Sequence, residues 1–210
     1  MSIVERLVRD AASLGISLTG QDAGRLLHLL EELERWNRTY NLTAIRGRED
    51  MLTHHLLDSL SVHADLRGTR IADVGTGAGF PGLPLAVVNP GRHFTLIDSN
   101  GKKVRFVEHA ARELGLANLE AMHARVESVK VWEPFDSVVA RAFAPLPELL
   151  AAVAPLCGPD TRVLAMKGRW PQSEIDALPA DWRTDDSHEL TVPGLGESRC
   201  VLVLARRREL

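Results

Sequence analysis

A glycine-rich segment, IADVGTGAGFPGLPLA, occupies residues 71–86 and is the part of the sequence that most clearly carries chemistry. A strand-like run leads into four glycines, Gly75, Gly77, Gly79 and Gly82, and an apolar, helix-like run follows. Loops of this kind hold nucleotide-like cofactors, because backbone N–H groups approach a ligand closely where no side chain intervenes. The spacing is compatible with two cofactors.

Charge distinguishes between these two cofactors. The segment from Gly77 to Gly82 matches the dinucleotide pattern GxGxxG, whereas the segment from Asp73 to Gly79 matches the DxGxGxG loop of S-adenosylmethionine (SAM) enzymes. A dinucleotide would place its doubly negative pyrophosphate beside the Asp73 carboxylate in a poorly solvated crevice. SAM carries an ammonium and a sulfonium, which this carboxylate attracts. Gly75 also opens the turn directly after the strand. The sequence therefore favours SAM, with NAD as the alternative.

Further cofactor contacts are predicted where the next two strands end. Asp98 ends a strand in HFTLIDSN, and a carboxylate there can accept hydrogen bonds from both ribose hydroxyls. Its alternative role is to cap the next helix, which Ser99 or Asn100 could do instead. Val126 and Glu127 follow the third strand, where the face and edge of an adenine would lie. An ordinary solvated loop is the equal alternative for these two residues.

The elements that must position these residues alternate between strands and helices from residue 70 onward. We predict strands at 70–74, 93–97, 118–122, 136–140, 161–166, near 183–191 and at 199–205, with helices between most of them, for example at 101–114 and 146–155. Such alternation predicts an α/β fold with helices on both faces of a mostly parallel, seven-stranded sheet. The connection TVPGLGES is too short for a helix, so the last two strands should pair antiparallel at one end.

Residues 1–65 are predicted to form a helical extension packed on the core, and residues 66–210 the SAM-binding domain. Leu26, Leu30 and Leu33 form an apolar stripe at helical spacing. The segment ERWNRTYNLTAIRGRED should interrupt this pattern, and a second helix is expected over residues 50–64.

Composition limits the class of protein further. The chain has 210 residues, of which 45% are hydrophobic, enough for one domain with an appendage. No apolar run reaches the ~18 residues of a membrane-spanning helix. The first residues mix acids with arginines, unlike a signal peptide. Cys157 and Cys200 form no CxxC pair and are expected to be reduced thiols. We therefore expect a cytoplasmic monomer without membrane association.

Several longer phrases occur together and in a fixed order: WNRTYNLTAI, HHLLDSL, DVGTGAGFPGLPLA, DSNGKKVRFV and FDSVVARAFAPL. Together they resemble the bacterial 16S rRNA guanine-N7 methyltransferase family, also called glucose-inhibited division protein B, over about residues 20–205. The resemblance implies the Rossmann-like fold of SAM-dependent methyltransferases with an N-terminal helical extension. It also implies a cytoplasmic SAM-dependent enzyme that methylates one guanine in the decoding region of 16S rRNA, in naked RNA or in the small ribosomal subunit. A SAM-dependent methyltransferase of a small molecule is the alternative.

The resemblance also implies individual contacts. By position, the family's cofactor contacts fall on Gly75, Phe80, Val126, Glu127 and Arg141, and Phe80 stands where many relatives carry leucine. Guanine N7 has a lone pair and no proton to remove, so the reaction needs no general base and no metal. The fourth strand accordingly runs into ARAFAP, without the [DN]PP[YF] element that binds an exocyclic amine and without a Pro-Cys nucleophile.

No catalytic residue is assigned with certainty, but three side chains are candidates for positioning. Arg141 ends a strand, where α/β proteins bind ligands, and can hold the SAM carboxylate, an rRNA phosphate or guanine. Asn37 and Asn41 would share a helix face and could cap the cofactor or touch the guanine, with local turn formation as the alternative. Phe143 could stack on the base or pack in the core.

Cationic side chains are expected to gather near the cofactor edge of the sheet. The net charge of −3 argues against a basic coat over the whole surface but leaves room for a local basic face. Such a face binds RNA phosphates. The RNA-binding candidates are Arg38, Lys102, Lys103, Lys167 and Arg169.

Overall fold

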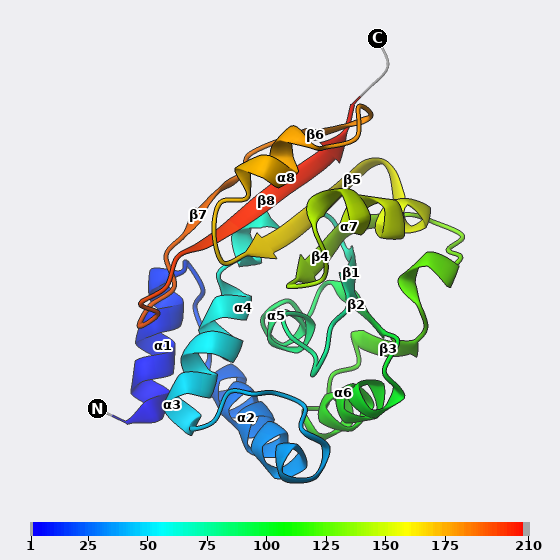
Figure 1. Cartoon of the computed structure of the whole chain (residues 1–210). Helices are drawn as coiled ribbons and strands as arrows, with labels where there is room; N and C mark the ends of the chain where they lie inside the picture. The colour runs from blue at the N-terminus through cyan, green and yellow to red at the C-terminus, as the bar shows by residue number, and fades with distance from the viewer. Residues whose placement is uncertain (1, 208–210) are drawn as a thin grey trace.

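The computed structural model describes residues 2–207, which form an eight-stranded mixed sheet with helices on both faces (Figure 1). The strands are β1 (Arg70–Val74), β2 (His93–Asp98), β3 (Leu119–His123), β4 (Phe135–Arg141), β5 (Cys157–Lys167), β6 (Trp182–Thr184), β7 (His188–Leu190) and β8 (Arg199–Arg206). Their order is β3-β2-β1-β4-β5-β8-β6, and β7 also pairs with β8. β1 to β5 are parallel, whereas β8 is antiparallel to β5, β6 and β7.

The predicted α/β class and the antiparallel end of the sheet are confirmed, with two differences in detail. The strand expected near 183–191 is two short strands, β6 and β7, and Asp185 between them donates its N–H to the carbonyl of Val203 on β8. β5 begins at Cys157 rather than at residue 161, because Cys157 pairs with Phe135 across an irregular register.

The helices divide between the two faces of the sheet. One face carries α1 (Ile3–Ser13), α2 (Gly20–Tyr40), a helix made of α3 (Arg48–Met51), the π-helical η1 (Leu52–Leu57) and α4 (Asp58–Leu60), then α5 (Gly82–Val88) and α6 (Gly101–Glu113). The other face carries α7 (Leu146–Val153) and α8 (Gln172–Asp176). Short 3₁₀ turns are η2 (His63–Asp65), η3 (Val126–Ser128) and η4 (Ala154–Leu156). Among the described residues, no helix is long and apolar enough to cross a membrane.

Two apolar cores separate these layers, as the alternation of side chains along a strand requires. Leu164 and Val203 face the core under the N-terminal helices, whereas Val163 and Leu204 face the core under α7. The predicted apolar stripe of α2 lies fully in the first core, together with side chains of α5 and α6. The N-terminal helices thus share a continuous core with the sheet, and a domain division at residue 65 remains a prediction.

The helix α2 is longer than the sequence pattern predicts. The amphipathic pattern ends near Glu34, but the helix continues to Tyr40, and Asn41 ends it in the left-handed region with φ of 50°. Tertiary packing supports the extra turns, because the Trp36 ring lies 5.6 Å from the Phe106 ring of α6. Asn37 and Asn41 therefore do not share a continuing helix face.

Candidate active site

The glycine loop after β1 has a backbone that only glycine adopts readily. Gly75, Gly77 and Gly79 have φ of 64°, 61° and 86°. A Cβ on Gly75 would lie 2.4 Å from the Phe143 ring, so this ring covers the loop where β4 ends. The positive φ values turn the chain sharply between β1 and α5 and keep its inner surface free of side chains.

The Asp73 side chain lies behind this loop and accepts hydrogen bonds from it. This side chain is buried, and Oδ2 accepts hydrogen bonds from the Thr76 hydroxyl at 2.6 Å and from the Gly82 N–H at 2.8 Å. Burial raises the pKa of this carboxyl to about 6. Oδ1 is also buried and has no hydrogen-bond partner among the described residues. An unpartnered carboxylate oxygen behind the loop fits a cationic ligand better than an anionic one.

A cavity of about 230 Å³ opens in front of the loop, and we call it the glycine-loop cavity. Its lining includes Gly75, Asp98, Val126, Glu127 and Phe143. Asp98 accepts the Gly77 N–H at 2.9 Å on Oδ2, and an N–H from the following loop on Oδ1. Since a carboxylate has ~four acceptor positions, both oxygens retain capacity for a ligand's hydroxyl groups.

The helix that follows Asp98, α6, has a different residue as its N-cap. Asn100 is the N-cap of α6, and its Oδ1 accepts the N–H of Lys102 at 3.0 Å. Asp98 is therefore not needed as the cap. It joins the glycine loop to the β2–α6 turn.

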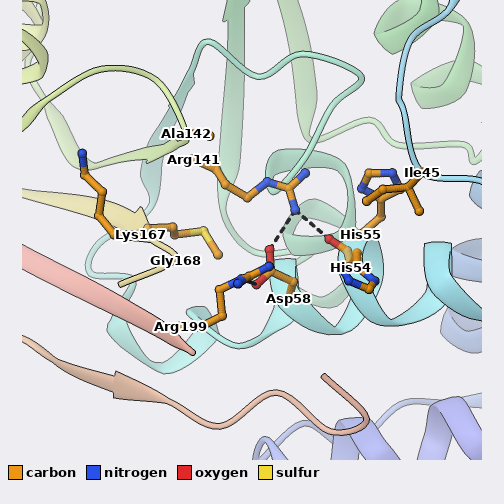
Figure 2. A pocket seen from close by; sticks show the side chains of 10 residues that line it. Ile45, His54, His55, Asp58, Arg141, Ala142, Lys167, Gly168 and Arg199 are labelled. Carbon is orange, nitrogen blue, oxygen red and sulfur yellow. Dashed lines mark hydrogen bonds and ion pairs between the residues drawn. The ribbon is translucent and has the colours of Figure 1, made fainter. Parts of the chain in front are cut away.

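A second cavity, of about 330 Å³, lies beside the first and is named here the arginine cavity (Figure 2). Its centre is a buried carboxylate, Asp58, which bridges two arginines. Arg141 Nη1 donates to Asp58 Oδ2 at 2.9 Å and to the carbonyl of His54, also at 2.9 Å. Arg199 Nε donates to Asp58 Oδ1 at 3.1 Å. The carboxylate thus links α4, on which it lies, to β4 and β8.

His55 forms part of the same cavity wall and is neutral. Its ring stacks on Phe80 with centroids 4.6 Å apart, and its Nε2 lies 3.0 Å from the Thr43 hydroxyl. Burial first, and then the charge of Arg141, lower the pKa of His55 to about 3. Near pH 7 it therefore contributes shape and hydrogen bonding without charge.

The chain after β4 links the two cavities. Arg141 and Ala142 line the arginine cavity, and Phe143 lines the glycine-loop cavity. Ala142 has a φ of 50°, which turns the chain so that consecutive side chains face different cavities. Consecutive residues of one segment therefore line both cavities.

The structure brings some predicted contacts together and separates others. Gly75, Asp98, Val126 and Glu127 line the glycine-loop cavity, whereas Arg141 lines the arginine cavity. Phe80 lines neither: it is buried beneath His55, with the Arg141 guanidinium 5.7 Å from its ring centre.

Asn37 and Asn41 also line neither cavity, and a contact of either residue with cofactor or guanine stays a prediction. Asn37 is buried and makes two hydrogen bonds of 3.0 Å with the backbone of Thr43. Asn37 can affect the arginine cavity only indirectly, because it holds Thr43, and Thr43 contacts His55 in the wall of that cavity. Asn41 is the exposed C-cap of α2.

The candidate RNA-binding cations occupy different environments. Arg38, Lys102 and Arg169 are exposed, and Lys103 is half-buried with Nζ close to the glycine loop at Gly77. Lys167 is different, because its Nζ donates to the Ala144 carbonyl at 2.9 Å and to Glu174 at 2.8 Å. In Figure 2 its side chain points away from Arg141 and Asp58. Its charge is therefore already paired within the protein.

Sequence reasoning missed the roles of Asp58, His55 and Arg199. The one-turn spacing of His54 and Asp58 in HHLLDSL is common by chance, and no metal site is predicted from it. Residues 2–207 contain no group of three or more His, Cys, Asp and Glu side chains placed to hold a metal ion. An acid inside an otherwise apolar helix face was the available signal, since a buried carboxylate needs cationic or hydrogen-bonding partners.

A family model described as rRNA small subunit methyltransferase G (GidB) matches residues 22–203. The chain belongs to this family. Relatives named ribosomal RNA small subunit methyltransferase G include one from Ectopseudomonas mendocina, 48% identical over 96% of this chain and 95% of the relative. Another, from Saccharophagus degradans, is 47% identical over 97% of this chain and 92% of the relative. The resemblance inferred from the sequence phrases is thereby confirmed.

Solved structures confirm the methyltransferase fold of this family member. Magnesium protoporphyrin IX methyltransferase from Synechocystis, with bound SAM, superposes with a TM-score of 0.61 at 18% identity, over 91% of this chain and 99% of the other. TrmN from Thermus thermophilus superposes with a TM-score of 0.58 at 22% identity, over 81% of this chain and 53% of the other.

Proposed function

We propose that the protein transfers a methyl group from SAM to N7 of one guanine in the decoding region of 16S rRNA. The family and the names of the relatives support rRNA of the small subunit as the substrate. The observation that carries the proposal is the pair of adjoining cavities at the end of β4, one suited to a nucleoside cofactor and one to an acceptor base. We also propose that the enzyme acts in the cytoplasm and is a monomer.

The glycine-loop cavity would hold the cofactor. Asp98 would accept hydrogen bonds from the ribose hydroxyls, and Val126 and Glu127 would contact the adenine. The carboxylate of Asp73, behind Gly75, would attract the cofactor's positive groups through its unpartnered Oδ1. SAM supplies an electrophilic methyl group when bound. Phe143 would cover the loop and limit access of water.

The arginine cavity would hold the guanine. Arg141 uses Nη1 for Asp58 and His54, and its Nε and Nη2 donate to no described residue, so they can meet a guanine or phosphate oxygen. His55 is neutral, so it does not oppose the positive charge that N7 methylation places on the base. Alignment of N7 with the methyl group then supplies the acceleration, an effect worth up to ~7–11 kcal/mol.

The test is transfer of a labelled methyl group from SAM to small subunits whose rRNA lacks the modification. Calorimetry with SAM and with NAD serves as the control for cofactor identity. Label in rRNA together with SAM binding supports the proposal. Label only in small molecules of a cell extract, or binding of NAD in place of SAM, contradicts it.

The rate of the chemical step should be nearly independent of pH between about 6.5 and 8.5, because no proton is removed from N7. With a pKa of about 3, His55 does not change its protonation state in this range. Single-turnover methylation at saturating SAM measures this step. A rate that rises tenfold per pH unit would indicate an exocyclic amine as the acceptor instead of N7.

SAM affinity should fall as the pH decreases below about 6, the pKa to which burial raises Asp73. A bound cation favours the ionised carboxylate, so protonation of Asp73 in the free protein competes with binding, and the dissociation constant should rise by up to about tenfold per pH unit. Calorimetry between pH 5 and 7 measures this dependence. The variant Asp73→Asn should bind SAM more weakly at pH 7 and show a flat profile. A sloped profile in a folded Asp73→Asn variant would assign the titration to another group.

A further inference from the structure

A third cavity adjoins the arginine cavity on the side away from the glycine loop. It has a volume of about 370 Å³ and is lined by Gly168, Arg169, Glu197, Ser198 and Arg199. Gly168 and Arg199 line both cavities, so the two are neighbours that share a wall. We call the third one the outer cavity. The volumes of the arginine cavity and the outer cavity both fall within the ~300–1,000 Å³ typical of small-molecule sites.

The outer cavity is lined by two guanidinium groups that retain donor capacity, those of Arg169 and Arg199. Glu197 is already paired with Arg199 Nη1 at 3.1 Å, and Arg199 Nε is held by Asp58. Arg199 Nη2 donates to no described residue, and Arg169 is exposed without an ion pair to any described residue. Both guanidinium groups can therefore donate to phosphate oxygens.

An exposed aromatic ring follows directly after Arg169. Trp170 is 43% exposed, and no ring of a described residue stacks on it. Its Nε1 donates to Gln172 Oε1 at 3.3 Å, which restrains the edge of the indole. Nucleobases that are not paired stack on aromatic rings of this kind.

We propose that the outer cavity, with Arg169 and Trp170, receives the nucleotide next to the target guanosine. The inference rests on the proposed function, in which the arginine cavity receives the guanine. The phosphodiester between the two nucleotides would pass Arg199, the cation that both cavities share. Two bases in separate cavities cannot remain stacked in a duplex, so the enzyme takes an unpaired, splayed-out segment of RNA.

Binding of short RNA tests this proposal without relying on catalysis. The probes are guanosine monophosphate and a single-stranded pentanucleotide with one central guanosine, measured by calorimetry with S-adenosylhomocysteine present. We expect the parent to bind the pentanucleotide at least about tenfold more tightly than the mononucleotide, and Trp170→Leu to lose about tenfold of that affinity. Arg169→Gln should reduce the salt slope of pentanucleotide binding by about 0.7, the value for one phosphate contact on a single strand.

Two matched variants serve as controls. Trp132 is fully exposed in the loop before β4, beside the first residues of β1 and β2, and Arg112 is exposed in the last turn of α6. Trp132→Leu and Arg112→Gln should leave pentanucleotide binding unchanged, and all four variants should keep the parent's affinity for SAM. Equal effects of Trp170→Leu and Trp132→Leu overturn the proposal, as does equally tight binding of a duplex with the same sequence.

The methylation assay distinguishes this inference from the proposed function. If the parent methylates small-subunit rRNA but its RNA binding does not depend on Trp170, the outer cavity is not a nucleotide subsite and the proposed function stands. If the pentanucleotide binds through Trp170 but no rRNA is methylated, the RNA subsite stands and the proposed function fails.

Discussion

Replacing Asp58 with alanine should destabilise the protein and impair methyl transfer more than any other single change in the arginine cavity. The variant leaves Arg141 and Arg199 without the buried carboxylate that bridges them. Removing one partner of a buried ion pair costs about 3–5 kcal/mol, and the partial exposure of both arginines places the expected loss of unfolding free energy near the lower end. Denaturant unfolding with SAM absent measures this loss.

The same variant should reduce kcat/KM for the RNA substrate by about 100-fold, because a guanidinium that is no longer anchored misaligns the base. Asp50→Ala is the matched control: this carboxylate is exposed on the same helix and makes no ion pair with a described residue. An Asp58→Ala variant with the parent's unfolding midpoint and the parent's kcat/KM would show that the bridge has no role.

Asp98→Ala should weaken SAM binding by about 1.5–3 kcal/mol, the usual value for a hydrogen-bonding group that is charged. The side chain reaches the glycine loop through the Gly77 N–H and lines the cavity in front of it, so its loss removes both a ligand contact and a loop contact. Calorimetry measures the dissociation constant directly.

Two comparisons make the Asp98 result specific. Glu113→Ala removes an exposed acid at the other end of α6 and should leave SAM affinity unchanged. Asp98→Asn keeps one acceptor oxygen and should lose less affinity than Asp98→Ala. Unchanged SAM affinity in a folded Asp98→Ala variant would remove this residue from the cofactor site.

Local patterns in the sequence were sufficient to group the residues of the glycine-loop cavity. The carboxyl ends of parallel strands meet at one edge of a sheet, so residues that follow β1, β2 and β3 converge there. Gly75, Asp98 and Glu127 could therefore be placed together before the structure was known, and they line one cavity.

The arginine cavity could not be predicted in the same way, because its contacts are distant in sequence. Asp58 meets Arg141 and Arg199 through three elements that only tertiary packing brings together. The π-helical turns of Leu52–Leu57 also change the helical phase, so a 3.6-residue period does not show which side chains face the cavity. Lys167 illustrates the same limit, since its pairing with Glu174 depends on where α8 packs.

Methylation of guanine N7 in 16S rRNA leaves a product whose chemistry distinguishes it from other methylated guanines. Small subunits that lack the modification are incubated with the protein and SAM, and the rRNA is then reduced, treated with aniline and analysed by primer extension. We expect strand cleavage at a single guanine of the decoding region, and only when both protein and SAM are present. Incorporation of methyl label into the rRNA without any aniline-dependent cleavage would contradict it.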